Sequence, residues 1–288
     1  MTTVVVTGAT GNVGRHVVSE LGRRGIPYRA LTRNLERATA VLGPGADLAQ
    51  GDFSDRDSLR AAFVGAEQAF LSCANDPRQV ENAANAIEAA ATAGVRQIVL
   101  LSTVGAEVGA AQTFADQHGR IEHRLRSAGI PFVILRSGFL MSNLLGSLPT
   151  IGQAGRIFLP ADDARVAMID PRDVAACAVA ALCGQRGDGE THLITGPEAM
   201  TFTEVARQLS TALGRTVEYV AVPDEAALAG MLEAGLPPWL AEGVMGTFQM
   251  LREGIAADTT DSVRQLTGHD PRPVADFAHD LMAPLLTR

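Results

Sequence analysis

The chain has 288 residues, enough to bury a substantial core, and its net charge of −8 without a basic stripe argues against nucleic-acid binding. Its three cysteines are too few for a disulfide framework or a zinc site, and no apolar run approaches the roughly 18 residues of a membrane span. We therefore expect a cytoplasmic protein that binds neither nucleic acid nor membrane.

The first predicted element is a short buried strand, Val4–Val6, that ends in a glycine-rich turn. The glycines follow G-x-x-G-x-x-G spacing, and residues 15–24 continue at helical period. Such a turn presents backbone N–H groups and a helix N-terminus to a pyrophosphate. The alternative is a turn that binds nothing. The expected cofactor contacts in the turn are Gly8, Thr10, Gly11, Asn12, Val13 and Gly14.

Strand and helix signals then alternate along the chain. Strands are expected at residues 28–32, 47–50, 69–71, 97–101 and 132–135, with helices at 35–42, 54–64, 77–93 and 112–128. This alternation predicts an α/β fold with a Rossmann-type, doubly wound parallel sheet. Residues 1–137 are assigned to the dinucleotide-binding domain, whose sheet is completed by later strands near 165–169 and 192–195.

Residues 138–288 are expected to form mainly a smaller C-terminal α/β portion that binds substrate. Helices are predicted near 138–148, 171–182 and 203–213, and a strand at 217–222. The helices after Asp224 contain Met231, Met245 and Met250. Adaptable methionines suit an irregular apolar pocket, although packing of a small domain explains them equally well.

The end of the second strand indicates which dinucleotide is preferred. An NAD site typically places an Asp or Glu there to bind the ribose 2′-hydroxyl, but this chain reads Leu31-Thr32-Arg33-Asn34. Arg33 is available for bidentate contact with a 2′-phosphate, so NADPH/NADP⁺ is expected rather than NAD(H), unless Arg33 is only a solvated surface residue. Further cofactor contacts are expected where later strands end, at Cys73, Ala74 and Thr103.

Several motifs together carry a family resemblance. They are V-T-G-A-T-G-N-V-G at the turn, then L-T-R-N, G-D-F, L-S-T, H-G-R-I-E, I-L-R-S-G-F and D-P-R-D-V-A. With these motifs the chain resembles the NmrA-like branch of the atypical short-chain dehydrogenase/reductases, over most of its length and less so after Asp224. The resemblance implies an NADP(H)-binding Rossmann domain in which Asp52 and Phe53 bracket the adenine. Members of the branch reduce quinones or ketones, or bind the cofactor only to sense it.

The catalytic residues are less evident, because the chain has no lysine: all 24 basic residues are arginine. The usual Ser-Tyr-Lys triad of the superfamily, with Y-x-x-x-K spacing, is therefore excluded. The equivalent helix reads His118-x-x-x-Glu122, which places both side chains on one face. His118 is the candidate proton donor, with Glu122 raising its pKa, unless the pair only positions the helix. Ser102 and Thr103 are candidates for orienting a carbonyl oxygen, or they bind the cofactor.

A substrate that stabilises its own anion, such as a quinone or a phenol-bearing aryl ketone, needs no protein acid. The leading expectation is an NADPH-dependent oxidoreductase, a ketoreductase or quinone reductase, acting on a small apolar aromatic substrate of the aromatic-polyketide (antibiotic biosynthesis) kind. The main alternative is a non-catalytic, NADP(H)-sensing regulatory protein, and a weaker one is an isomerase or dehydratase with a retained cofactor. Both a monomer and a homodimer are compatible with the sequence.

Overall fold

The computed structural model describes residues 3–184 and 189–286. These residues form two compact units. Unit 1 takes in Met1–Ala110, Ala115–Arg136 and Pro171–Leu193, and unit 2 takes in Ala111–Phe114, Ser137–Asp170 and Ile194–Arg288. The expected division after residue 137 is therefore too simple, because the chain returns to unit 1 at Pro171.

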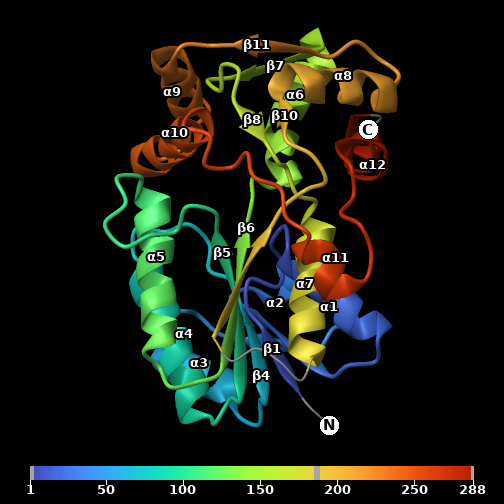
Figure 1. The fold of residues 1–288 in the computed structure, drawn as a ribbon. Coiled ribbons are helices and arrows are strands. Elements are labelled where there is room, and N and C mark those ends of the chain that lie inside the picture. Colours follow the sequence, from blue (N-terminus) through green and yellow to red (C-terminus); the bar gives the residue numbers. More distant parts are fainter. Residues whose placement is uncertain (1–2, 185–188, 287–288) are drawn as a thin grey trace. The chain divides into compact units, whose positions relative to one another are not determined.

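Unit 1 is built on a twisted sheet with helices on both faces (Figure 1). Among the described residues the strand order is β3-β2-β1-β4-β5-β6-β9, and β1 pairs in parallel with both β2 and β4. This arrangement confirms the predicted Rossmann-type, doubly wound α/β fold. The strands are β1 (Val4–Val6), β2 (Tyr28–Thr32), β3 (Leu48–Gln50), β4 (Gln68–Leu71), β5 (Gln97–Thr103), β6 (Phe132–Ser137) and β9 (Glu190–Ile194).

The helices of unit 1 cover the sheet because their apolar faces match its buried strands. Figure 1 shows α4 and α5 on one face and α1 and α7 on the other. One buried cluster, which includes Phe63, Ile87 and Leu125, packs α3, α4 and α5 on the sheet. The helices are α1 (Gly14–Arg23), α2 (Leu35–Leu42), α3 (Arg56–Phe63), α4 (Gln79–Thr92), α5 (Thr113–Arg126) and α7 (Pro171–Cys183).

Unit 2 contains two small sheets, in which β7 pairs with β11 and β8 with β10. Its strands are β7 (Arg156–Leu159), β8 (Arg165–Val166), β10 (Met200–Thr201) and β11 (Glu218–Ala221). Its helices are η1 (Met141–Ser147), α6 (Leu148–Ala154), α8 (Phe202–Leu213), α9 (Asp224–Glu233), α10 (Pro238–Arg252), α11 (Ser262–Thr267), α12 (Val274–Phe277), η2 (Ala278–Met282) and α13 (Ala283–Leu286).

The expected strand near 165–169 does not join the main sheet, and that prediction is wrong. Its backbone groups are used inside unit 2, where Val166 pairs with Met200 in an antiparallel bridge. Ala167 N donates to Ala256 O at 2.9 Å. The seventh strand is β9 instead, which overlaps the expected strand near 192–195.

The methionines after Asp224 do not share one environment. Met250 is buried, whereas Met231 and Met245 are partly exposed. Helix α9 has no buried residue, and its Leu228 and Met231 are partly exposed. Within the described residues, no helix is long and apolar enough to cross a bilayer.

Candidate functional site

The order of the strands reverses at β1, which lies between β2 and β4. The sheet runs outward from β1 through β2 in one direction and through β4 in the other, and ligands of open α/β sheets bind at the carboxyl ends of strands where the order reverses. Thr7, directly after β1, links the end of β1 to the end of β4 through its hydrogen bonds with Ser72. Its Oγ1 accepts the Ser72 N–H at 2.8 Å and lies 3.0 Å from Ser72 O, to which it donates.

The glycines of the turn are required by close backbone approach. Gly8 has a φ of 60°, and a Cβ on it would lie 2.9 Å from Ser72 O. A Cβ on Gly14 would lie only 2.1 Å from Gly8 O, while Gly11 N donates to Gly8 O at 2.9 Å. The turn is therefore folded tightly against the start of α1, and three glycines meet that geometry.

The start of α1 is open to an anion. Among the described residues no side chain caps this helix. The Arg15 and His16 N–H groups donate to the carbonyls of Gly11 and Val13, so the N–H groups left for an anion are those of residues 12–14. Gly11 and Asn12 are exposed and Thr10 is partly exposed, whereas Val13 is buried and offers only its backbone. Helix N–H groups and the helix dipole favour a phosphate at this point, so the cradle fits a dinucleotide pyrophosphate.

Arg33, Asp52 and Cys73 follow the ends of β2, β3 and β4. They lie close enough for the charge of Arg33 to act on both of the other two. The hydrogen bonds from Ser54 hold the pKa of Asp52 below its usual range, and the charges of Arg33 and Arg78 lower it further. Burial raises the pKa of the Cys73 thiol to about 12, with Arg33 acting in the opposite direction. Arg33 is exposed. A guanidinium in this position suits a 2′-phosphate.

The remaining predicted cofactor residues lie at or just after the ends of β3, β4 and β5. Phe53 is partly buried, and its carbonyl accepts a hydrogen bond from Asn85 at 2.9 Å. Ala74 is exposed after β4, and Thr103 ends β5 with a partly exposed side chain. Because burial keeps the Cys73 thiol protonated at neutral pH, this residue is a small uncharged side chain beside the predicted cofactor site and not a nucleophile.

Ser102 does not fit the expected catalytic role. Its hydroxyl is buried and donates to Glu122 Oε1 at 2.6 Å. Because a hydroxyl has one proton, Ser102 has none left for a substrate carbonyl while this bond is made. The structure places Ser102 in a buried polar network, and Thr103 is the residue of this pair that faces partly toward solvent.

His118 lies one turn before Glu122 on α5, but the expected effect of Glu122 on it is too small. Burial lowers the pKa of His118 to about 4, although the charge of Glu122 acts to raise it. The imidazole is therefore neutral near pH 7, and the expected raised pKa is wrong. Its Nδ1 is shut off from solvent and has no hydrogen-bond partner among the described residues. A buried ring nitrogen without a partner is a feature that folded proteins rarely contain, and His118 as a whole is partly exposed.

Sequence reasoning missed Thr7, Arg126 and Arg136. Arg136 gave a usable signal, because it follows four apolar residues in β6 and a charge at the end of a buried strand needs a partner. In the structure its guanidinium binds Glu122. Thr7 gave no signal beyond its place next to the first glycine.

The strand order, the tight glycine turn and the open start of α1 define a dinucleotide-binding protein of the Rossmann type. The chain matches the NmrA-like family over residues 1–269 and belongs to that family, as the motifs predicted.

Named relatives share most of the chain. It is 40% identical, over 96% of both chains, to (4-alkanoyl-5-oxo-2,5-dihydrofuran-3-yl)methyl phosphate reductase of Streptomyces griseus. It is 33% identical, again over 96% of both chains, to an NAD(P)H azoreductase of Xenophilus azovorans. Among solved structures, it resembles NADPH-dependent quinone oxidoreductase QOR2 of Escherichia coli in complex with NADPH, with a TM-score of 0.86 and 28% identity over 97% of this chain and 99% of that one.

Proposed function

We propose that this protein is an NADPH-dependent reductase. The observation that carries the proposal is the turn between β1 and α1, where a Cβ on Gly14 would lie 2.1 Å from Gly8 O and no described side chain caps the helix. That cradle fits a pyrophosphate, and Arg33 stands at the next strand end to meet a 2′-phosphate. The relatives at 40% and 33% identity are both named reductases, which favours reduction over cofactor sensing.

The substrate class follows from what the relatives' named substrates share. An acylated dihydrofuranone, an azo compound and a quinone each contain an electron-poor, conjugated double bond. Such a bond accepts hydride and spreads the resulting negative charge over neighbouring oxygen or nitrogen atoms. We infer that this chain reduces a conjugated, electron-poor acceptor, such as a quinone or an aryl ketone. That class needs less help from a protein acid than an isolated ketone does.

NADPH supplies the hydride when it is bound. The chain's own residues bind and orient: the turn holds the pyrophosphate, and Arg33 holds the 2′-phosphate. His118 is partly exposed, and burial of its ring lowers its pKa to about 4, so the imidazole is uncharged near neutral pH. The role assigned to it is to donate a hydrogen bond to the developing anion and not to transfer a proton from an imidazolium. Of the two hydroxyls predicted to orient the acceptor or the cofactor, Ser102 and Thr103, only Thr103 is partly exposed.

Substrate binding is assigned to unit 2. Within its described residues, α9, α10 and the segment before α5 line a cavity of about 290 Å³ that includes Leu228 and Met245. Leu228 and Met245 offer adaptable apolar surface, while Glu242 and Gln249 supply polar contacts.

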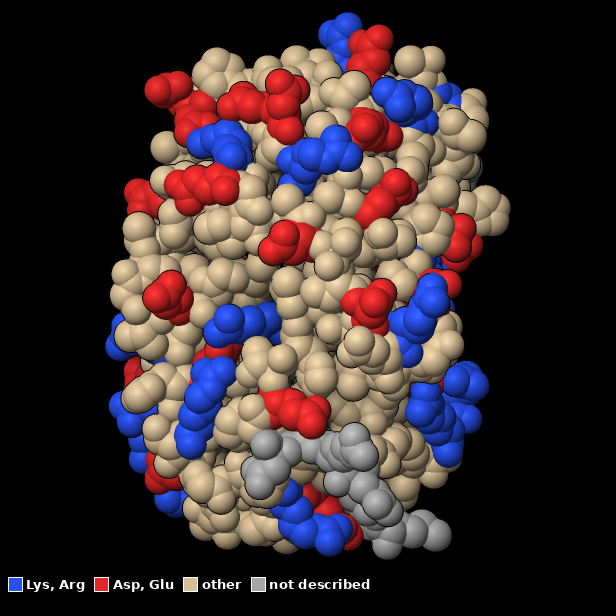
Figure 2. Space-filling view, in the orientation of Figure 1, with Lys and Arg blue, Asp and Glu red and all other residues tan. Residues whose placement is uncertain are grey.

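On the face drawn in Figure 2, acidic and basic side chains are interspersed and form no continuous basic stripe among the described residues. A cytoplasmic location remains part of this proposal.

Replacing Arg33 by alanine should weaken NADPH selectively. The loss of one charged contact to the 2′-phosphate corresponds to roughly 1–3 kcal/mol, or about a 5- to 150-fold higher Kd. NADH, which lacks that phosphate, should bind almost unchanged. Titrations of both cofactors check this, with Arg60→Ala as the control, because Arg60 is an exposed arginine paired with Asp57 on α3. Equal losses for NADPH and NADH would remove Arg33 from the role.

Cofactor sensing is the second candidate, and one observation favours it. The Ser102 hydroxyl donates its hydrogen bond to Glu122. Helix α5, where the usual triad would place its tyrosine and lysine, contains neither residue. A sensor would bind NADPH tightly and oxidise none of it with any acceptor. Turnover with any member of an acceptor panel would exclude a purely sensing role.

A further inference from the structure

Glu122 is a fully buried carboxylate with an unusual number of donors. Its Oε1 accepts from Ser102 Oγ at 2.6 Å and from Arg136 Nε at 2.9 Å. Its Oε2 accepts from Arg136 Nη2 at 2.7 Å and from Arg126 Nη1 at 3.0 Å. Although burial acts to raise the pKa of Glu122, hydrogen bonds from Arg136, Ser102 and Arg126 hold it below its usual range. The group is therefore ionised and bound on both oxygens.

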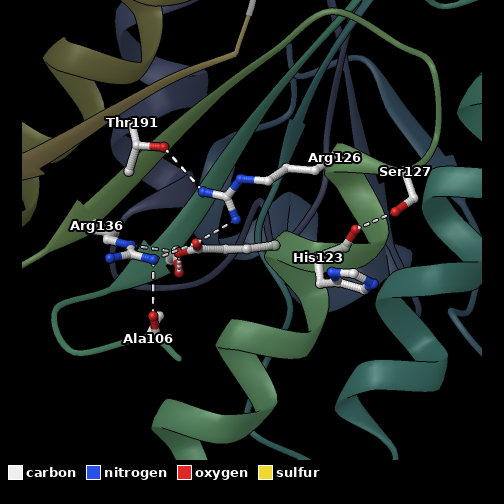
Figure 3. A network of polar contacts seen from close by, with 8 residues as sticks. Ala106, His123, Arg126, Ser127, Arg136 and Thr191 are labelled. Atoms are coloured by element: carbon white, nitrogen blue, oxygen red, sulfur yellow. Dashed lines mark hydrogen bonds and ion pairs between the residues drawn. The ribbon is translucent and has the colours of Figure 1, made fainter. Parts of the chain in front are cut away.

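These bonds join elements that are far apart in the sequence. Ser102 lies on β5, Arg136 on β6, and Glu122 and Arg126 on α5. Figure 3 shows the guanidinium groups of Arg126 and Arg136 converging from α5 and β6, and it shows each reaching a further partner. Arg126 Nη2 lies 3.3 Å from Thr191 Oγ1 on β9, and Arg136 Nη2 donates to Ala106 O at 2.9 Å.

A second set of contacts holds the same helix one turn earlier, around His118. A Cβ on Gly119 would lie 2.3 Å from Glu107 C, so the segment after β5 lies directly on α5. Glu107 N donates to Ala115 O at 3.2 Å, and Gly109 N donates to Asp116 Oδ1 at 2.8 Å. The turn of α5 that carries His118 is thus fixed between this segment and the Glu122 cluster, which is defined as Ser102, Glu122, Arg126 and Arg136.

We propose that Glu122 is a positioning residue: through its paired hydrogen bonds with Arg136 it fixes α5 against β5 and β6 and so holds His118 in place relative to Thr103. The inference rests on the proposed function for its kinetic consequences. Glu122 acts by geometry and not as an ion-pair partner of His118, because both of its oxygens are already taken by the arginines and Ser102. The chain has no lysine, and two arginines make the charged contacts to Glu122 that hold α5 on the sheet.

The kinetic test compares Glu122→Gln with Arg136→Lys. Arg136→Lys keeps the charge but loses the two parallel N–H donors that match a carboxylate. If geometry is what matters, both variants should lower kcat by roughly ten- to hundredfold, with the Kd for NADPH nearly unchanged. Full activity of Arg136→Lys would overturn the proposal. The matched control is Arg120→Lys, an exposed arginine of α5 that lies 3.6 Å from Asp116. Ser102→Ala, which keeps both arginines, gives a milder variant with a smaller loss if the others fold poorly.

Combination with His118→Ala separates positioning from general damage. If Arg136→Lys acts through His118, then adding it to His118→Ala should lower kcat little further, because the two changes remove the same contribution. Losses that multiply would show that the cluster acts elsewhere and would overturn the proposal.

A further readout does not depend on turnover. In protein carrying ¹³C-labelled histidine, the His118 resonances should shift in Glu122→Gln and Arg136→Lys, while those of His279, which is exposed and hydrogen-bonded to Asp280, stay in place. Unchanged His118 resonances in folded variants would contradict the inference. This result also separates the two proposals, since the spectra report on the position of His118 even if no acceptor is reduced.

Discussion

Replacing Gly14 by alanine should abolish tight NADPH binding. The new Cβ would lie 2.1 Å from Gly8 O and 2.7 Å from Gly8 C, both backbone atoms that no side-chain rotation can move. The turn must open, and the N–H groups that face the pyrophosphate lose their alignment. Hydrogen bonds to charged groups contribute about 1.5–3 kcal/mol each. The loss of two of them corresponds to at least a roughly hundredfold higher Kd, which calorimetric titration with NADPH measures.

The control for this change lies on the same helix. Gly22 is also in α1, but a Cβ there would meet only the Tyr28 ring, at an ordinary contact distance of 3.7 Å. Gly22→Ala should keep NADPH binding and raise the free energy of unfolding by about 0.5–1 kcal/mol, because alanine favours a helix interior. Wild-type NADPH affinity in Gly14→Ala would contradict the assignment of this turn as the pyrophosphate site.

Replacing His118 by alanine should lower kcat by roughly a hundredfold, the scale expected for the loss of one hydrogen-bond donor to a developing anion. In the proposed mechanism, this change removes the hydrogen bond that the neutral imidazole donates to the developing anion. The measurement is the steady-state rate with an aryl ketone that carries no phenol, because a quinone stabilises its own anion and depends less on a hydrogen-bond donor. His123→Ala is the matched control, because His123 lies on the same helix with an exposed side chain. A loss of less than tenfold would mean that His118 is not needed.

The pH dependence gives His118 a second test. Burial lowers its pKa to about 4, so the imidazole stays neutral as the pH rises above that value. The rate should therefore show no inflection near pH 6.5, the ordinary pKa of a histidine. An inflection near that pH that disappears in His118→Ala would show that an imidazolium takes part, as the i, i+4 pairing with Glu122 first suggested.

The fold and the cofactor turn were predictable because their signals are local. A β-branched strand, a glycine turn and a helix in immediate succession define the βα unit, and alternation of such units defines the parallel sheet. The same periodicity could not say where β8 belongs. A two-residue strand has no period of its own, and its pairing with Met200 depends on packing inside unit 2.

The candidate catalytic residues were harder to predict, because their properties depend on distant neighbours. The spacing of His118 and Glu122 places them on one helix face, but it does not reveal that Arg136, fourteen residues further along the chain, takes the carboxylate. Nor does it show that burial outweighs the charge of Glu122 at His118. Ser102 looked like a free strand-end hydroxyl until the structure placed Glu122 at 2.6 Å. Burial and long-range pairing decide such roles.

The most direct test of the proposed function is the oxidation of NADPH by purified protein with a panel of acceptors, followed by the loss of NADPH absorbance. The panel should hold quinones, azo compounds, acylated dihydrofuranones and hydroxyaryl ketones. We expect turnover with at least one conjugated acceptor and a much lower kcat/KM with NADH. Tight NADPH binding without oxidation by any acceptor would contradict the reductase proposal and favour cofactor sensing.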